Sequence, residues 1–368
     1  MNDMKQQKIT DQIYSICASL VGVVLGLLFG LIVLIVANPK FALPGFVRLL
    51  TSPLTNGSTN IGAVLYYGTT FIICALSVAF AGKWGMFNIG VGGQFIVGSY
   101  MVCLIGVRLA HLPPFILVPL ALICATLAGA LWGAILGSLR SIFNISEVVV
   151  SILLNYIGLY TANMLIQRTI YDSYGNRSIQ VGSNAVIPRI GLDKIFPHSG
   201  VDLGIVVAII LAIIIYYILN KTTFGYEIKL CGYNKDAASY VGVNARKNAI
   251  MTMAIAGALP AIAGGFWYLS SAGNYMAVVD SIPAAPMTGM SASLLAVGNP
   301  IGIIFTGLFV AYITVGGNNL QVFGYVPEIV SIVTGAIIYC SAFVALIRLS
   351  IKRFHVKVIR KRKGDAEE

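Results

Sequence analysis

Apolar stretches of about twenty residues recur along almost the entire chain, and this feature restricts the possible folds more than any other. A helix crosses a hydrocarbon core about 30 Å thick with roughly 20 such residues. Backbone groups in lipid have to form hydrogen bonds within the protein, which favours helices, whereas transmembrane β-barrels show shorter alternating strands. The sequence therefore predicts an all-α, polytopic transmembrane helix bundle of about ten helices.

Composition and charge agree with this prediction. The chain is 58% hydrophobic and 10% charged, whereas a soluble domain carries about a quarter charged residues. The net charge is +11, and the basic residues lie mostly between the apolar stretches and in the tail from Lys352 to Lys363. Such charges orient a membrane protein and attract anionic lipid, so we expect membrane lipid and no nucleic acid as a partner.

The expected organisation is a cytoplasmic N-terminal segment (1–12), a transmembrane domain (13–351) and a basic cytoplasmic tail (352–368). With the N-terminus inside, 17 of the 24 Lys and Arg residues fall on the inner side, which predicts that both termini are cytoplasmic. Ten spans would divide into two sets of five with opposite orientation, a possible inverted repeat. The expected spans are 13–36, 61–81, 88–107, 115–138, 146–166, 201–219, 249–270, 283–298, 300–316 and 328–349.

Two polar loops are long enough to carry structure of their own. The outer loop, residues 167–200, is expected to form a structured cap or a docking surface. The inner loop, residues 220–248, is basic and contains a helix-compatible stretch from Asn234 to Tyr240. Between glycines, this short helix could enter a groove on a partner, although an ordinary loop would look similar.

Ionisable side chains are almost absent from the expected spans. Intramembrane charges mark proton relays and ion-coupling sites, so their scarcity argues against a proton-driven carrier. The amides and hydroxyls that remain suit a neutral, hydrogen-bonding solute such as a nucleoside or a sugar, or they join helix to helix. The phosphate-binding pattern Gly-x-x-x-x-Gly-Lys-Ser/Thr does not occur, so uphill transport would need a separate ATPase. We expect no metal site and no catalytic residue, because the three histidines have no obvious partner.

The segment from Gly85 to Gln94 holds four glycines together with Phe87, Asn88 and Gln94. Glycine weakens a helix by roughly 1 kcal/mol relative to alanine. A polar, glycine-rich break at membrane depth is tolerated only where it lines a cavity or is buried in protein. We interpret this segment as a helix break near a translocation pathway, with a turn between two spans as the alternative.

A second motif begins at Ser146 and Glu147, a residue pair typical of a helix start. Asn155 and Tyr156 follow in the middle of the same expected span. They could offer an amide and an aromatic face to a base or a sugar. The candidate pathway residues are therefore Phe87, Asn88, Gln94, Asn155 and Tyr156.

Together with the segments from Gly257 to Gly265 and from Ala296 to Pro300, these motifs occur in an order that resembles one family over nearly the whole chain. The chain resembles the permease subunits of ABC importers related to ribose and branched-chain amino-acid permeases, in the nucleoside-uptake branch. The resemblance implies import of a nucleoside by alternating access. It places the contact with the ATPase in the inner loop, at Gly232, Asn234, Asp236, Ala237, Ala238, Tyr240 and Gly242.

The resemblance also implies the partners: an ABC ATPase, a second permease chain, identical or different, and an extracellular substrate-binding lipoprotein or periplasmic protein. ATP and Mg would be bound by the ATPase, and this chain would bind no cofactor and catalyse no reaction. Other readings of the residues remain: an ABC permease for a simple sugar such as ribose, a stand-alone secondary carrier or channel, or a membrane scaffold that transports nothing.

Overall fold

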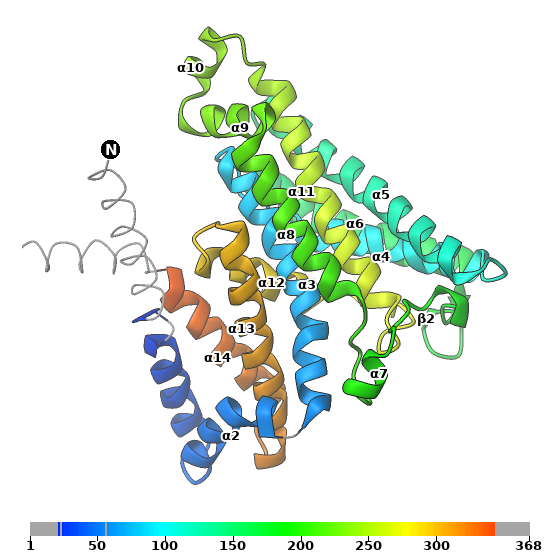
Figure 1. The fold of residues 1–368 in the computed structure, drawn as a ribbon, viewed down its shortest axis with the longest axis vertical. Helices are drawn as coiled ribbons and strands as arrows, with labels where there is room; N and C mark the ends of the chain where they lie inside the picture. Colours follow the sequence, from blue (N-terminus) through cyan, green and yellow to red (C-terminus); the bar gives the residue numbers. More distant parts are fainter. Residues whose placement is uncertain (1–20, 23, 56, 343–368) are drawn as a thin grey trace, which may run out of the picture. The chain divides into compact units, whose positions relative to one another are not determined.

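The computed structural model describes residues 21–22, 24–55 and 57–342, and it is almost entirely helical (Figure 1). The described residues form two compact units. One comprises Pro53–Val315, and the other belongs to the segments Met1–Ser52 and Gly316–Glu368. The expected N-terminal segment 1–12, the tail 352–368 and parts of the first and last expected spans lie outside the described residues.

The elements follow one another along the chain with short connections except between α6 and α8 and between α11 and α12. A helix at Val24–Ala37 precedes them. The elements are α2 (Ala42–Thr55), α3 (Ser58–Lys83), α4 (Val91–Arg108), α5 (Pro114–Phe143), α6 (Glu147–Thr169), β1 (Tyr171–Asp172), β2 (Arg177–Ser178), η1 (Ser183–Ala185), α7 (Leu192–Ile195), α8 (Gly204–Lys221), α9 (Thr223–Tyr233), α10 (Lys235–Tyr240), α11 (Ala245–Tyr268), α12 (Ala284–Leu295), α13 (Pro300–Asn318), η2 (Asn319–Phe323) and α14 (Pro327–Ala342).

Seven helical segments among the described residues are long and apolar enough to cross a membrane, and they confirm the polytopic all-α prediction. Each coincides with an expected span: α3, α4, α5, α6, α8, α11 and α13 continued by η2. The expected span 283–298 is instead the 12-residue α12. At 1.5 Å per residue α12 is about 18 Å long, too short to cross the hydrocarbon core alone.

A second difference concerns the segment between the first two expected spans. The sequence predicts no helix between these spans, whereas the structure has the 14-residue helix α2 there. Pro53 lies inside α2. A proline is typical of the end of a helix, so its presence here argues against a helix in the sequence. In the smaller unit, the Tyr325 hydroxyl donates hydrogen bonds to the carbonyl oxygens of Leu34 and Asn38, at 3.3 and 3.1 Å.

Helix α5 packs against α11 so closely that backbone atoms of the two helices are in contact. A Cβ atom built on Gly129 would lie 2.5 Å from the Gly257 carbonyl oxygen, and one built on Gly133 would overlap the Met253 carbonyl oxygen. Glycines at these positions therefore let the two backbones touch, as small residues four apart on one helix face do. The opposite side of α5 exposes large apolar residues such as Leu127 and Leu131, which suits contact with lipid.

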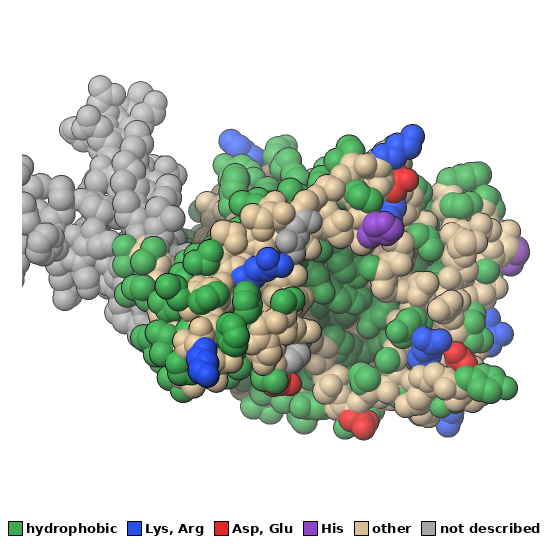
Figure 2. Space-filling model, turned by 90° about the horizontal axis from the view of Figure 1, so that it is seen from below, with side chains coloured by type: hydrophobic (Ala, Val, Ile, Leu, Met, Phe, Trp, Pro, Cys, Tyr) green, Lys and Arg blue, Asp and Glu red, His purple; other side chains and the backbone are tan. Residues whose placement is uncertain are grey.

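Large apolar side chains remain exposed over much of the surface. Figure 2 shows a face on which hydrophobic side chains are abundant and charged side chains are scattered. A surface of this kind would aggregate in water but is stable in a bilayer. The structure thus agrees with the membrane location that the composition indicates.

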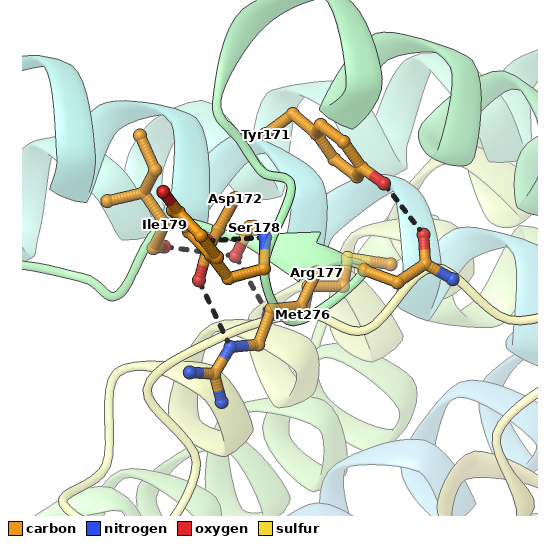
Figure 3. A network of polar contacts seen from close by, with 8 residues as sticks. Tyr171, Asp172, Arg177, Ser178, Ile179 and Met276 are labelled. Atoms are coloured by element: carbon orange, nitrogen blue, oxygen red, sulfur yellow. Dashed lines mark hydrogen bonds and ion pairs between the residues drawn. The ribbon is translucent and has the colours of Figure 1, made fainter.

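The loop after α6 is structured, as expected (Figure 3). Strands β1 and β2 pair antiparallel, with Tyr171 opposite Ser178. The Ser178 N–H donates to the Met276 carbonyl oxygen at 2.8 Å, and the Met276 N–H donates to the Ser178 hydroxyl at 2.9 Å. The Arg177 guanidinium lies 3.4 Å from the Asp172 carboxylate and 4.4 Å from the centre of the Tyr275 ring. The hairpin is thereby fastened to the loop that follows α11.

Candidate functional site

The glycine-rich segment forms a buried turn between two separate helices. Helix α3 ends at Lys83 and α4 begins at Val91, so the alternative of a turn between two spans is the one that the structure shows. The Asn88 side-chain amide donates to the Ser77 hydroxyl at 2.8 Å and to the Gln94 carbonyl at 2.9 Å. All three side chains are fully buried. We call these three residues, together with Asn155, the amide clasp.

Asn155 joins the amide clasp from α6. Its side-chain carbonyl accepts from the Gly93 N–H at 2.7 Å, and its amide donates to the Ile89 carbonyl at 3.0 Å. The first N–H groups of a helix have no partner within the helix. The residue at the start of α4, Gly90, has no side chain to supply one. Asn155 therefore caps α4 from a neighbouring helix.

Four of the five predicted pathway residues lie in this region of the structure. The polar ones among them form their hydrogen bonds with other protein groups. The side chains of Asn88, Gln94 and Asn155 bond to one another or to backbone, and Phe87 is half-buried beside them. Their direct contact with a solute stays a prediction. The geometry shows that the three amides hold the α3, α4 and α6 backbones together.

Tyr156 lies on a different side of α6, on an exposed face near the middle of the helix. Its ring stacks with that of Tyr160, with 6.5 Å between the ring centres and 24° between the planes. Both rings are about half exposed. Their hydroxyls form no hydrogen bond with the part of the chain that the structure describes. The prediction named Tyr156 but missed Tyr160, which the four-residue spacing on one helix face could have indicated.

Asn163 lies one turn beyond Tyr160. Its side-chain amide donates to the Val279 carbonyl at 2.8 Å. Its own carbonyl oxygen is buried and has no partner among the described residues.

The inner loop forms two short helices with a sharp bend between them (Figure 1). Asn234 caps α10, since its side-chain oxygen accepts from the N–H groups of Asp236 at 2.9 Å and Ala237 at 3.1 Å. Gly242 follows α10 with φ +85°, a conformation that favours glycine. The helix predicted from Asn234 to Tyr240 is confirmed. Asn234 caps its start, and Gly242 allows the turn after its end.

The predicted docking residues divide between an exposed and a buried set. Ala238 is fully buried, whereas Ala237 on the same helix is exposed. Tyr240 is 92% exposed and Tyr233 is 89% exposed. These two aromatic rings, exposed at the ends of α9 and α10, form a surface suited to a protein partner. We call the exposed residues Tyr233, Ala237, Tyr240 and Val241 the α10 tip.

The start of α6 differs from the prediction in the hydrogen bonds that its residues form. Glu147 is in the first turn of α6 as expected, but the Ser146 side chain makes no capping hydrogen bond, and Glu147 pairs with Arg140 at 2.8 Å.

Asp202, a residue not among the predicted site residues, is 4% exposed and lies just before α8. One of its oxygens accepts from the Gly204 N–H at 2.7 Å, and the other has no partner among the described residues.

Burial raises the pKa of Asp202 to about 6, although the Gly204 N–H and the charge of Arg189 oppose the shift. Arg189 itself donates to the Ser199 carbonyl and the Ser271 hydroxyl. Within the described residues, no cluster of His, Cys, Asp or Glu could hold a metal ion.

A bundle of long apolar helices, with a polar turn buried inside it and a capped helix projecting from one end, defines a polytopic membrane protein of the transporter class. The chain belongs to the family described as the permease component of the branched-chain amino acid transport system, whose model matches residues 60–342. This confirms the resemblance deduced from the motifs.

Individual relatives narrow the comparison. The chain is 34% identical to the guanosine ABC transporter permease NupP of Bacillus subtilis, over 87% of this chain and 90% of NupP. It is 32% identical to the nucleoside ABC transporter permease NupB of Lactococcus lactis, over 94% of this chain and 96% of NupB. A second guanosine permease of Bacillus subtilis, NupQ, is 28% identical over 74% of this chain and 86% of NupQ. No solved structure matches the chain significantly.

Proposed function

We propose that this chain is the membrane-spanning permease subunit of an ABC importer that carries nucleosides. The observation that supports this most directly is the similarity to NupP and NupB across nearly the full length of all three chains. The chain itself would bind no cofactor. ATP and Mg would be held by a partner ATPase, which drives alternating access and can do so only by contacting the two states differently.

The α10 tip is the proposed contact with the ATPase. It lies at the end of the bundle that the charge bias places in the cytoplasm, where both termini would also lie. Its exposed tyrosines and small Ala237 would fit a groove on the partner.

The other partners would be a second permease and an external binding protein. Because NupP and NupQ of one organism both match this chain, we propose a pair of permease chains in the membrane. An extracellular lipoprotein or periplasmic protein would deliver the nucleoside at the opposite end, where the hairpin tip residue Tyr174 is fully exposed.

The exposed face of α6 is the proposed wall of the substrate pathway. Phenolic hydroxyls near the middle of a membrane helix are costly in lipid unless they find polar partners, so Tyr156 and Tyr160 are better placed against a pathway than against acyl chains. Exposed mid-helix residues of α5 such as Leu131 are aliphatic by contrast. An aromatic pair also provides a surface for stacking a nucleobase.

The docking assignment is tested with Ala237→Glu. Because Ala237 is exposed, a glutamate there should leave the fold intact but prevent copurification of the ATPase and abolish uptake. The matched control is Ala277→Glu, at an exposed alanine beyond the far end of α11, which should keep ATPase association. Ala238 is unsuited to this test because its burial would confuse docking with folding. Normal association and uptake by the Ala237→Glu protein would show that the docking site lies elsewhere.

The cargo is tested by competition. Unlabelled guanosine and uridine should compete with uptake of a labelled nucleoside, whereas ribose should not. Competition by ribose at similar concentration would favour a sugar permease. Concentrative uptake by this chain reconstituted without an ATPase would favour a stand-alone carrier.

A further inference from the structure

At Gly232 the end of α9 touches the end of α3 backbone to backbone. A Cβ atom built on Gly232 would overlap the carbonyl oxygen of Lys83 and would lie 3.2 Å from the carbonyl carbon of Trp84. From the other side, a Cβ on Gly85 would lie 3.8 Å from the Gly232 Cα. The nearest atoms on both sides are thus backbone atoms, which cannot yield by changing rotamer as a side chain can. A displacement of α9 therefore acts directly on the α3 backbone, since close-packed atoms transmit strain.

A second contact joins α10 to the same place. The Lys235 ammonium lies 4.7 Å from the centre of the Trp84 ring, within the range of a cation–π interaction. Trp84 is 4% exposed and packs in the same core cluster as Ile228 and Cys231 of α9. Lys235 is the first residue of α10, next to Asn234 that caps it. The α10 tip is thus fastened to Trp84 at its base.

Beyond Trp84 the chain enters the amide clasp within four residues. Asn88 bonds to Ser77 and Gln94, and Ser77 donates to the Ala256 carbonyl of α11 at 2.5 Å. Asn155 bonds the backbone on both sides of this turn and belongs to α6. The links between Trp84 and α6 are therefore covalent bonds and buried or part-buried hydrogen bonds, which are costly to leave broken.

We propose that Gly232, Lys235 and Trp84 form a mechanical relay that carries movement of the α10 tip through the amide clasp to α6. The relay rests on the proposed ATPase docking at α10, and it adds the route by which docking reaches the pathway face with Tyr156. Trp84 and Lys235 are positioning residues in this scheme. They contact neither nucleotide nor solute.

The test measures coupling in the assembled transporter, with both permeases, the ATPase and the binding protein in liposomes. Trp84→Leu removes the ring and Trp84→Phe keeps an aromatic face, while Lys235→Gln removes the cation. The matched control is Lys247→Gln, which loses the same charge from an exposed residue of the same loop. The readouts are ATPase copurification and the number of nucleosides moved per ATP hydrolysed.

We expect all four variants to retain the ATPase. Nucleosides moved per ATP should fall about three- to fivefold in Lys235→Gln, the size of an exposed cation–π contribution, and further in Trp84→Leu. Trp84→Phe and Lys247→Gln should stay close to the parent, and Lys235→Gln combined with Trp84→Leu should be no worse than Trp84→Leu alone. An unchanged transport ratio in Lys235→Gln and Trp84→Leu would overturn the relay, and so would loss of the ATPase in either.

The outcomes separate the two proposals. If Ala237→Glu releases the ATPase but Lys235→Gln leaves the ratio unchanged, docking at α10 stands and the relay fails. If Ala237→Glu has no effect, the docking assignment fails first. Should Trp84→Leu not fold, the exposed Lys235→Gln and its Lys247→Gln control decide the matter.

Discussion

The Asn155 side chain in α6 accepts a hydrogen bond from the Gly93 N–H in the first turn of α4, at 2.7 Å. Two helices that are distinct spans thus share one capping interaction inside the bundle. The same amide group donates to Ile89, so Asn155 holds the turn at two points. A single polar side chain therefore both caps the start of α4 and holds α6 beside it.

Asn155→Ala should therefore destabilise the protein rather than only slow transport. It leaves the buried Gly93 N–H and Ile89 carbonyl without partners, at a cost of about 1–3 kcal/mol. Thermal unfolding of the purified protein in detergent should show a lower transition temperature. The control Asn220→Ala, at an exposed asparagine near the end of α8, should change it little. Equal stability of both variants would contradict the capping role.

Gly133→Ala should disturb the packing of α5 against α11. The added methyl group would overlap the Met253 carbonyl oxygen, and forced overpacking of this kind costs about 1–3 kcal/mol. Gly335 in α14 is the matched control because a Cβ there meets no described atom within 4 Å. Gly335→Ala should be neutral or stabilising by up to about 1 kcal/mol. The same unfolding measurement distinguishes them, and a neutral Gly133→Ala would show that the helices can separate freely.

Tyr156→Ala and Tyr160→Ala should each raise the KM for nucleoside uptake about fivefold or more, because base stacking on an aromatic ring is worth about 1–3 kcal/mol. Phenylalanine at either position should preserve most of the affinity if stacking is the main contribution. Leu131→Ala, on the exposed face of α5, is the control and should leave KM unchanged. Uptake that is indifferent to both alanine variants would remove this face of α6 from the pathway.

Stability should depend on pH through Asp202. Its folded pKa is raised to about 6 by burial, above the unfolded value near 4. The folded state then binds more protons in that interval, so stability falls as pH rises from about 4 to about 6 and levels off above. Asp202→Asn should abolish this slope and stabilise the protein at pH 7 by about 1–3 kcal/mol. Parallel slopes for parent and variant would show that Asp202 stays ionised.

Much of the helical architecture could be predicted because hydrophobic length leaves few alternatives. The seven spanning helices and the α10 helix beginning after Asn234 follow from local patterns. The prediction of a membrane span was wrong for one segment, where the helix is shorter than the apolar stretch that contains it. The segment 283–298 is apolar enough for a span, but its helix ends at Leu295 and starts at Ala284.

The candidate site was harder to predict because its chemistry depends on neighbours distant in sequence. Nothing local to Asn155 indicates that it caps a helix more than sixty residues earlier. Asp202 falls at the edge of the expected span 201–219 and just before the first residue of α8, and only the folded chain shows that it is buried. The contact between Lys235 and Trp84 joins residues about 150 positions apart, so its existence could not be deduced from either motif alone.

The hairpin after α6 has a consequence for the order in which the protein matures. Ser178 finds its backbone partner in Met276, 98 residues later. During synthesis the hairpin stays without this partner until α8 and α11 have been made and inserted. The hairpin can therefore reach its final form only after residue 276 has been synthesised, and a nascent chain halted at the end of α11 would present the hairpin without this attachment.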